Sequence, residues 1–228
     1  MATGPYNFGA RKAVSHSDSG QQWRQTIYHI DCFDSGLSKQ NFGAAYDIVT
    51  LAVGGGTNEV TTNPSRNTLI TGAVLGNTEG TRSLDNACVR SREYAIGLEC
   101  ELSSAADIEF RFGFYKDADE YIYIEFDKSL SNNWRLHIDD GTGAEFSAEG
   151  LVAEANTDYY MLLWVETDGT PHWAIGTTPL NIVEMGRTGI ANVMTADYYY
   201  YEWYVKAEQA VVKQAKIDYF ERFKTKLH

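Results

Sequence analysis

Residues Ile108 to Ile138 contain three segments in which apolar and polar residues alternate. They read IEFRFGF at 108–114, YIYIEF at 121–126 and WRLHI at 134–138. Successive side chains of a β-strand point to opposite faces of the sheet, so such alternation is typical of a strand with one buried face. The pattern predicts three consecutive strands. Their inward residues should share one core: Phe110, Phe112, Ile122, Ile124, Trp134 and Leu136.

Turn-forming residues separate these segments. Asp117-Ala118-Asp119 follows the first segment, and Asp139-Asp140-Gly141 follows the third. Asp binds nearby backbone N–H groups and Gly accepts positive φ, so both residue types favour turns. Strands that recur roughly every 10 to 15 residues indicate a β-sandwich instead of alternating β-α-β units.

The same signals continue on both sides of this stretch. Ile27–Phe33 predicts an early strand, and the Gly-, Thr- and Asn-rich residues 52–83 predict long loops with short strands. Tyr159–Val165 is apolar on both faces, which predicts a central strand, and His172–Ile175 predicts the next one. We therefore expect an all-β protein, a two-sheet antiparallel β-sandwich with little helix.

The last segment, 208–227, fits two structures. It contains good helix formers, and Val212, Ala215, Tyr219 and Phe223 have helical spacing. Ala215, Ile217 and Tyr219 also have strand spacing. A final strand is the favoured interpretation, and a helix is the alternative.

Residues 1–22 differ from the rest of the chain in composition. They are rich in Gly, Ser, Gln and Asn and contain almost no aliphatic residues, so they cannot form a core of their own. We expect an extended N-terminal arm at 1–22 and one β-sandwich domain at 23–228. The arm would bind another chain through three aromatic anchors and two basic residues: Tyr6, Phe8, Trp23, Arg11 and Lys12.

Charge and hydropathy exclude several classes of protein. The 228 residues include 19 Lys and Arg against 31 Asp and Glu, a formal net charge of −12 that repels nucleic-acid phosphates. The longest strongly apolar run, 159–165, is too short to cross a bilayer. The first residues lack the basic and apolar regions of a secretory signal. We expect neither nucleic acid nor membrane as a partner, and assembly in a cytoplasm.

Cysteines and loop motifs predict no cofactor and no metal. Cys32, Cys88 and Cys100 are an odd set without a C-x-x-C spacing, and Cys100 alternates with apolar neighbours, which predicts a buried free thiol. The sequence has no G-x-S-x-G elbow and no glycine-rich loop followed by the phosphate-binding lysine. Residues 117–128 lack the glycine and the final Glu of a calcium loop.

The order of these segments resembles the concanavalin A-like, laminin-G-like jelly roll. The resemblance rests on Cys32-Phe33-Asp34, Phe112-Gly113-Phe114, the 121–126 strand, the 139–141 turn and the closing segment 215–223. It implies that the closing strand pairs back near the N-terminus. Proteins of this fold include lectins, glycan hydrolases, carbohydrate-binding modules and structural proteins of tailed bacteriophages, so the resemblance predicts the fold and leaves the function open.

A hydrolase of this fold would show a Glu-x-Asp-x-Glu strand, in which two carboxylates on one face act as nucleophile and acid. The nearest segment, Glu125–Ser129, lacks the third carboxylate, and the pair Glu99 and Glu101 is followed by Ser103 at the next position on the same face. We expect these groups to be exposed strand carboxylates, and we expect no enzymatic activity.

Two groups of aromatic residues favour a binding surface. Tyr121, Tyr123, Arg135 and His137 lie at outward positions and predict one exposed patch, suited to a glycan or to a protein. The run Tyr198–Tyr204 has aromatic residues on both faces. Either one face of it is an exposed strip, or loops of the chain cover it.

Together these features favour a non-enzymatic structural protein of a tailed-phage virion, assembled in the host cytoplasm. It would be a capsid decoration or cement protein, or a minor capsid protein. Its partners would be the major capsid protein or another virion protein, and copies of itself, with a homo-trimer as the leading arrangement. The alternative is a lectin-like carbohydrate-binding module with a glycan as ligand, and a glycan hydrolase is less favoured.

Overall fold

A computed structural model describes residues 25–32, 48–62, 65–83, 88–89, 94–142, 145–165, 169–178, 181–187 and 198–225. Regular secondary structure in these residues consists of sixteen β-strands. Within this described part, no helix is long and apolar enough to cross a membrane.

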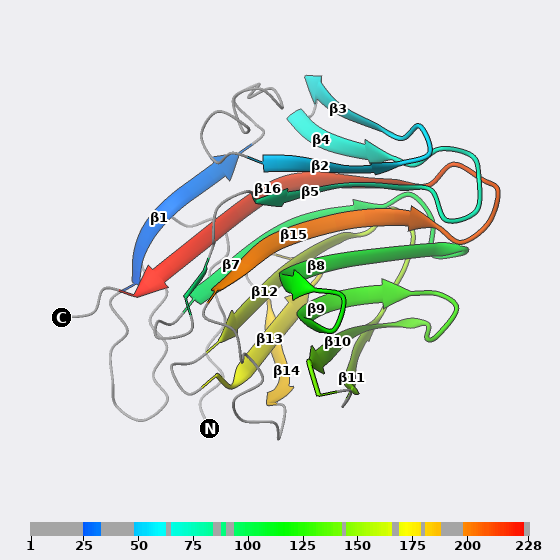
Figure 1. The fold of residues 1–228 in the computed structure, drawn as a ribbon. Coiled ribbons are helices and arrows are strands. Elements are labelled where there is room, and N and C mark those ends of the chain that lie inside the picture. The colour runs from blue at the N-terminus through cyan, green and yellow to red at the C-terminus, as the bar shows by residue number, and fades with distance from the viewer. Residues whose placement is uncertain are drawn as a thin grey trace.

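The strands form two antiparallel sheets of eight strands each, stacked as two layers (Figure 1). The back sheet has the order β14 (Val183–Arg187), β13 (Pro171–Gly176), β12 (Asp158–Val165), β7 (Tyr94–Leu102), β16 (Gln214–Thr225), β4 (Ser65–Ile70) and β3 (Thr57–Thr62), and β1 (Gln25–Cys32) pairs with β16. The front sheet has the order β11 (Glu145–Val152), β10 (Asn133–Asp140), β9 (Glu120–Asp127), β8 (Ile108–Asp117), β15 (Tyr198–Ala207), β5 (Thr78–Ser83) and β2 (Ile48–Val53), and β6 (Cys88–Val89) pairs with β15.

One hydrophobic core fills the space between the sheets. Trp134 of the front sheet contacts Tyr159 of the back sheet, with ring centroids 5.2 Å apart, so the two layers pack directly against each other. The alternation-based prediction is confirmed, because all six predicted residues lie in this core: Phe110, Phe112, Ile122, Ile124, Trp134 and Leu136. The predicted buried free thiol is also confirmed for Cys100, and burial raises its pKa well above the ordinary value.

The predicted strands of the front sheet form consecutive antiparallel pairs. Ile124 on β9 lies opposite Phe112 on β8 and opposite Leu136 on β10, which places three core residues in one row. The turn after β8 is where the sequence predicts it, and the Asp117 carboxylate accepts a hydrogen bond from the Asp119 N–H at 3.0 Å.

The C-terminal segment is a strand, so its helical interpretation is wrong. β16 lies inside the back sheet, where it pairs with β7 and β4. It also pairs with β1, which is the closing arrangement that the resemblance implies. β12 lies between β13 and β7, as expected for a strand that is apolar on both faces.

The predicted arm lies outside the described residues. This holds for all of its candidate anchors, namely Tyr6, Phe8, Arg11, Lys12 and Trp23. The arm and its boundary with the sandwich therefore stay predictions.

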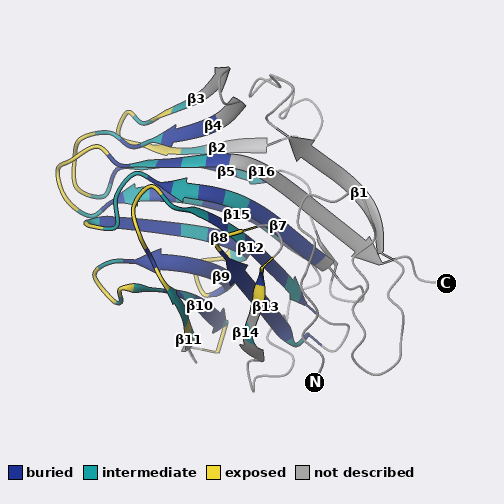
Figure 2. Cartoon of the chain, turned by 180° about the vertical axis from the view of Figure 1, so that it is seen from behind, coloured by how far each residue is buried: buried dark blue, intermediate teal, exposed yellow. Residues whose placement is uncertain are grey.

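Strand β9 is buried along its whole length, on both faces (Figure 2). An antiparallel strand in a two-layer sandwich commonly shows one face to water. On β9 the side opposite the core contains polar residues, among them Tyr121, Tyr123 and Glu125. Buried polar groups need partners, and these partners define the candidate site.

Candidate functional site

We define the outer face of the front sheet as the side of β5, β8, β9, β10 and β15 that points away from the core. The antiparallel register aligns its residues in rows that cross the strands. The first row contains Arg135, Glu125, Arg111 and Tyr204. The second row, two residues further along each strand, contains His137, Tyr123, Gly113, Glu202 and Arg82.

Glu125 is the centre of the first row. Its Oε2 lies 2.9 Å from Arg111 Nε and 3.0 Å from His137 Nδ1, and its Oε1 accepts a 2.7 Å hydrogen bond from Arg135 Nε. Burial opposes ionisation of Glu125. The hydrogen bond with His137 and the positive charges of Arg111 and Arg135 outweigh burial and hold the pKa of Glu125 below its ordinary value. Glu125 is therefore a buried carboxylate that two arginines hold in place.

Glu202 is the corresponding acid of the second row. Arg82 Nε lies 2.6 Å from Glu202 Oε2, and the Tyr123 hydroxyl donates a hydrogen bond to Glu202 Oε1. Tyr123 and Glu202 lie on strands that flank β8, and the residue between them is Gly113. Glycine leaves the space above β8 free for this contact, because it has no side chain.

Tyrosine rings fill the space between the charged groups. The Arg111 guanidinium lies 5.4 Å from the Tyr123 ring centroid and 5.8 Å from that of Tyr204, and Arg82 lies 3.8 Å from the ring centroid of Tyr115. The Tyr204 hydroxyl donates to Glu109 at 2.8 Å. Burial and the nearby Glu109 charge raise the pKa of Tyr204, so its hydroxyl keeps its proton and remains a donor.

The four residues predicted as a binding patch lie on this face. Tyr121 and Tyr123 stack at 4.9 Å, and the Tyr121 ring meets His137 edge-on at 5.2 Å. The expected exposure is wrong: Tyr121, Tyr123 and His137 are only 8%, 1% and 8% exposed, and Arg135 is mostly buried. Arg135 and His137 contact Glu125, Tyr123 donates to Glu202, and the Tyr121 hydroxyl lies 3.4 Å from His137 Nε2, so each polar group has a partner within the face.

Sequence reasoning did not identify the acids that organise the face. Glu125 and Asp127 were expected to be exposed, and both are buried. Opposite charges at outward positions of neighbouring strands could have identified these acids, since Arg135, Glu125 and Arg111 lie directly opposite one another.

The aromatic run on β15 is divided between the two faces. Tyr199, Tyr201 and Trp203 lie in the core, while Tyr200 and Tyr204 are half-buried on the outer face. The alternative of a fully exposed strip is therefore wrong, and Tyr204 belongs to the charged network.

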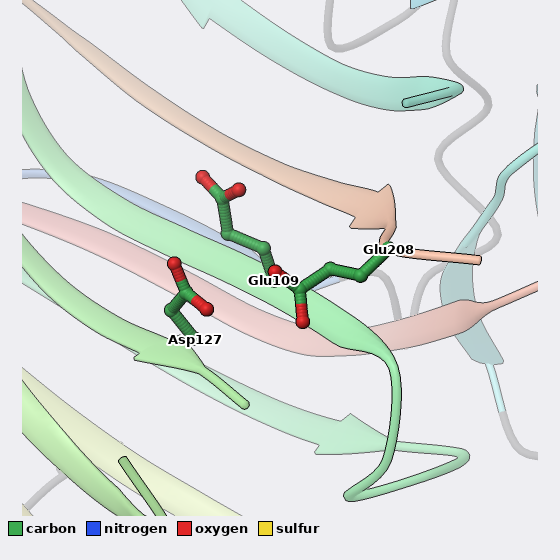
Figure 3. Close-up of side chains that lie close together, drawn as sticks. All are labelled: Glu109, Asp127 and Glu208. Carbon is green, nitrogen blue, oxygen red and sulfur yellow. The ribbon is translucent and has the colours of Figure 1, made fainter. Parts of the chain in front are cut away.

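A second group of acids lies at one end of the same face. Carboxylate oxygens of Glu109, Asp127 and Glu208 lie within 4.8 Å of one another, which makes this the candidate cation-binding group among the described residues (Figure 3). Burial, the Asp127 charge and a hydrogen bond to Asp127 raise the pKa of Glu208. Asp127 Oδ1 also accepts bonds from the Ser129 N–H and hydroxyl, at 2.9 and 2.6 Å. Glu208 therefore resists ionisation beside Asp127.

Catalysis by Glu125 does not fit this geometry. A retaining glycoside hydrolase needs a carboxylate that can reach the sugar carbon and a protonated carboxyl group beside it. Glu125 is fully buried, and cations occupy both of its oxygens. The groups of this face that a ligand can contact are the guanidinium, ammonium and tyrosine groups, which lie nearer to solvent than the acids.

No family model matches the sequence, and no curated protein does. Solved structures are similar in fold. A protein of unknown function from Shewanella oneidensis MR-1 has 13% identity and a TM-score of 0.62, over 90% of this chain and 86% of that one. A structure from work on endo-acting O-glycanases of the human gut microbiota has 10% identity and a TM-score of 0.64, over 88% and 100%. Peanut lectin has 9% identity and a TM-score of 0.58, over 88% and 98%. These likenesses establish a concanavalin A-like β-sandwich.

Proposed function

We propose that this chain is a non-enzymatic carbohydrate-binding protein and that the outer face of the front sheet is its binding face. One observation carries the proposal: arginines fixed by buried acids lie beside half-buried tyrosine rings. Glycan sites combine a few rigidly placed polar groups with aromatic rings that pack against the sugar. The outer face provides both.

The arginines retain hydrogen-bonding capacity for a ligand. The shortest contacts of Arg82 and Arg111 with their carboxylates are made by Nε, at 2.6 Å to Glu202 and at 2.9 Å to both Glu109 and Glu125. A guanidinium has five N–H donors, so the two Nη groups of each arginine can serve hydroxyl or carboxylate groups of a sugar. The ion pairs below them limit the rotamer entropy lost on binding.

The fold neighbours support a glycan as ligand. Peanut lectin shares the sandwich, and so does the structure from work on O-glycanases that initiate mucin breakdown. The position of Glu125 favours binding over hydrolysis, because cations occupy the carboxylate that would have to react.

The role in a phage capsid is the other candidate that the sequence favours. It depends on the arm at 1–22, which lies outside the described residues, so the capsid partner, the homo-trimer and the virion location stay predictions.

The experiment is a glycan-array screen followed by calorimetric titration of the purified chain. We expect binding to at least one glycan, and we expect Tyr115→Ala to weaken it about tenfold through loss of ring packing. Tyr160→Ala is the matched control, since Tyr160 is a half-buried tyrosine on β12 of the back sheet. Absence of glycan binding, or equal effects of the two variants, would overturn the proposal.

A further inference from the structure

The outer face of the front sheet carries its charges in two levels. The carboxylates form the lower level, and the side chains of Glu125, Glu202 and Glu109 are 0%, 2% and 3% exposed. The cations above them reach water, with exposures of 39%, 28%, 21% and 12% for Lys206, Arg82, Arg111 and Arg135. A ligand that approaches this face meets positive groups first.

The charge count on the face points in the same direction. Four cations are paired with three carboxylates in this network, whereas the whole chain has a net charge of −12. Further acids surround this network: Asp127 and Asp139 lie at the margins of the face, and the exposed Glu149 on β11 lies opposite Arg135. Asp127 is hydrogen-bonded to Ser129 and Glu208, and Asp139 accepts the Gly141 N–H at 3.0 Å. Within the network itself, cations therefore outnumber carboxylates by one, and they are its more exposed members.

The arginines are also regularly spaced. Arg135 on β10 and Arg111 on β8 belong to one row and are separated by β9, while Arg82 on β5 lies two strands beyond β8, in the next row. Neighbouring strands are about 4.8 Å apart, so Arg135 and Arg111 have Cα atoms about 10 Å apart, and Arg82, which is also displaced by two residues along its strand, lies about 12 Å from Arg111. These distances are about the length of two sugar units in an extended glycan.

We infer that the ligand is an acidic glycan with a carboxylate on alternate sugars, which lies across the strands and binds Arg135, Arg111 and Arg82 in turn. The inference rests on the proposed function and names the class of glycan. Each uronate carboxylate accepts hydrogen bonds from guanidinium Nη groups, the pairing for which arginine geometry is suited. Tyr115 and Tyr204 lie beside these arginines and pack against the sugar rings between the carboxylates.

The test compares two forms of one polymer by calorimetry. The probe is a hyaluronan oligosaccharide, in which every second sugar is a uronate, and the control ligand is the same oligosaccharide with its carboxylates reduced to alcohols. We expect the acidic form to bind at least about tenfold more tightly, as for one charge-assisted hydrogen bond, and to lose affinity at high salt.

Variants locate the binding site. Arg82→Gln should weaken hyaluronan binding about tenfold or more, and Arg135→Gln should do the same if thermal melting shows that the variant is folded. Lys216→Gln is the matched control, because Lys216 forms a comparable ion pair with Glu101, at 2.5 Å, on the back sheet. Equal losses for Arg82→Gln and Lys216→Gln would overturn the assignment to this face.

The outcomes separate this inference from the proposed function. If the reduced oligosaccharide binds as tightly as the acidic one, or if only neutral glycans of the array bind, the acidic class is wrong and carbohydrate binding stands. If no glycan binds, both fail. If single-stranded DNA of equal charge binds as tightly as hyaluronan, the face is a general polyanion surface and the inference is overturned.

Discussion

At the scale of the residue, Glu125 determines how the outer face is built. Removing a carboxylate from water costs several kcal/mol unless other charges and hydrogen bonds compensate it. Arg111, Arg135 and His137 provide that compensation within one row and its neighbour. Because Glu125 keeps its charge, the arginines keep fixed positions.

Replacing Glu125 with Gln should lower the free energy of unfolding by about 2–3 kcal/mol at neutral pH, because two partly buried cations lose their buried counter-charge. The folded pKa of Glu125 lies below its unfolded value. Its ion pairs therefore stabilise the fold above about pH 4.5, and this contribution is lost as the pH falls through the folded pKa. Urea unfolding from pH 7 downward should show the difference between wild type and variant shrinking below about pH 4.5.

Glu149→Gln is the control for that measurement. Glu149 is exposed and hydrogen-bonded to Ser131 and Asn133, so its replacement should change stability by less than about 0.5 kcal/mol. If the two variants unfold at the same urea concentration, the Glu125 network contributes nothing to stability.

At the level of single strands, alternation of apolar and polar residues identifies those strands that have one face in the core and the other face away from it. It predicts β8, β9 and β10 because one side of each is apolar and the other polar. β11, with the sequence EFSAEGLV, alternates only weakly, because Ala148 and Gly150 on its inward side are small, and it pairs with the edge that β10 offers. The site is harder to predict, since the pairing of Glu202 with Tyr123 requires knowledge that β15 lies beside β8.

The close approach of β8 and β9 at Gly113 gives a prediction for one strand. A Cβ atom at position 113 would lie 2.0 Å from the Ile122 carbonyl oxygen, so Gly113→Ala should cost about 2–3 kcal/mol through displacement of the backbone. Thermal or urea unfolding measures this loss.

Gly55→Ala is the matched glycine control. Position 55 has open space around its Cβ and a φ of +84°, so the change costs only the strain of that conformation, about 1 kcal/mol. A smaller loss for Gly113→Ala than for Gly55→Ala would contradict the close packing of β8 against β9.

At the scale of the whole molecule, the two sheets depend on one shared core. Trp134 and Trp203 belong to the front sheet and Trp173 to the back sheet, and all three are fully buried in the same cluster. Each sheet buries the apolar face of the other, and that face would be exposed to water if one sheet were absent.

The sheets should therefore unfold together. Tryptophan fluorescence, which reports on the core, and far-ultraviolet circular dichroism, which reports on the strands, should give one coincident transition in urea. Trp164→Phe removes a half-buried tryptophan on the outer side of the back sheet, so that the signal comes more strongly from the core. Two separated transitions would show that the layers are independent.

The position of β16 in the back sheet affects the order in which the strands pair during folding. The strands β8, β9, β10 and β11 are neighbours along the chain and in the sheet, so their hairpins can form by local search. β16 instead joins β7, β4 and β1, and it places Gln25 opposite Thr225. Bringing such distant segments together costs loop entropy before any contact compensates it, which is typical of β-proteins that fold in milliseconds to seconds. We therefore expect the arrival of β16 to be among the slow steps of folding, and until then the edges of β7 and β4 are open to the strands of other chains.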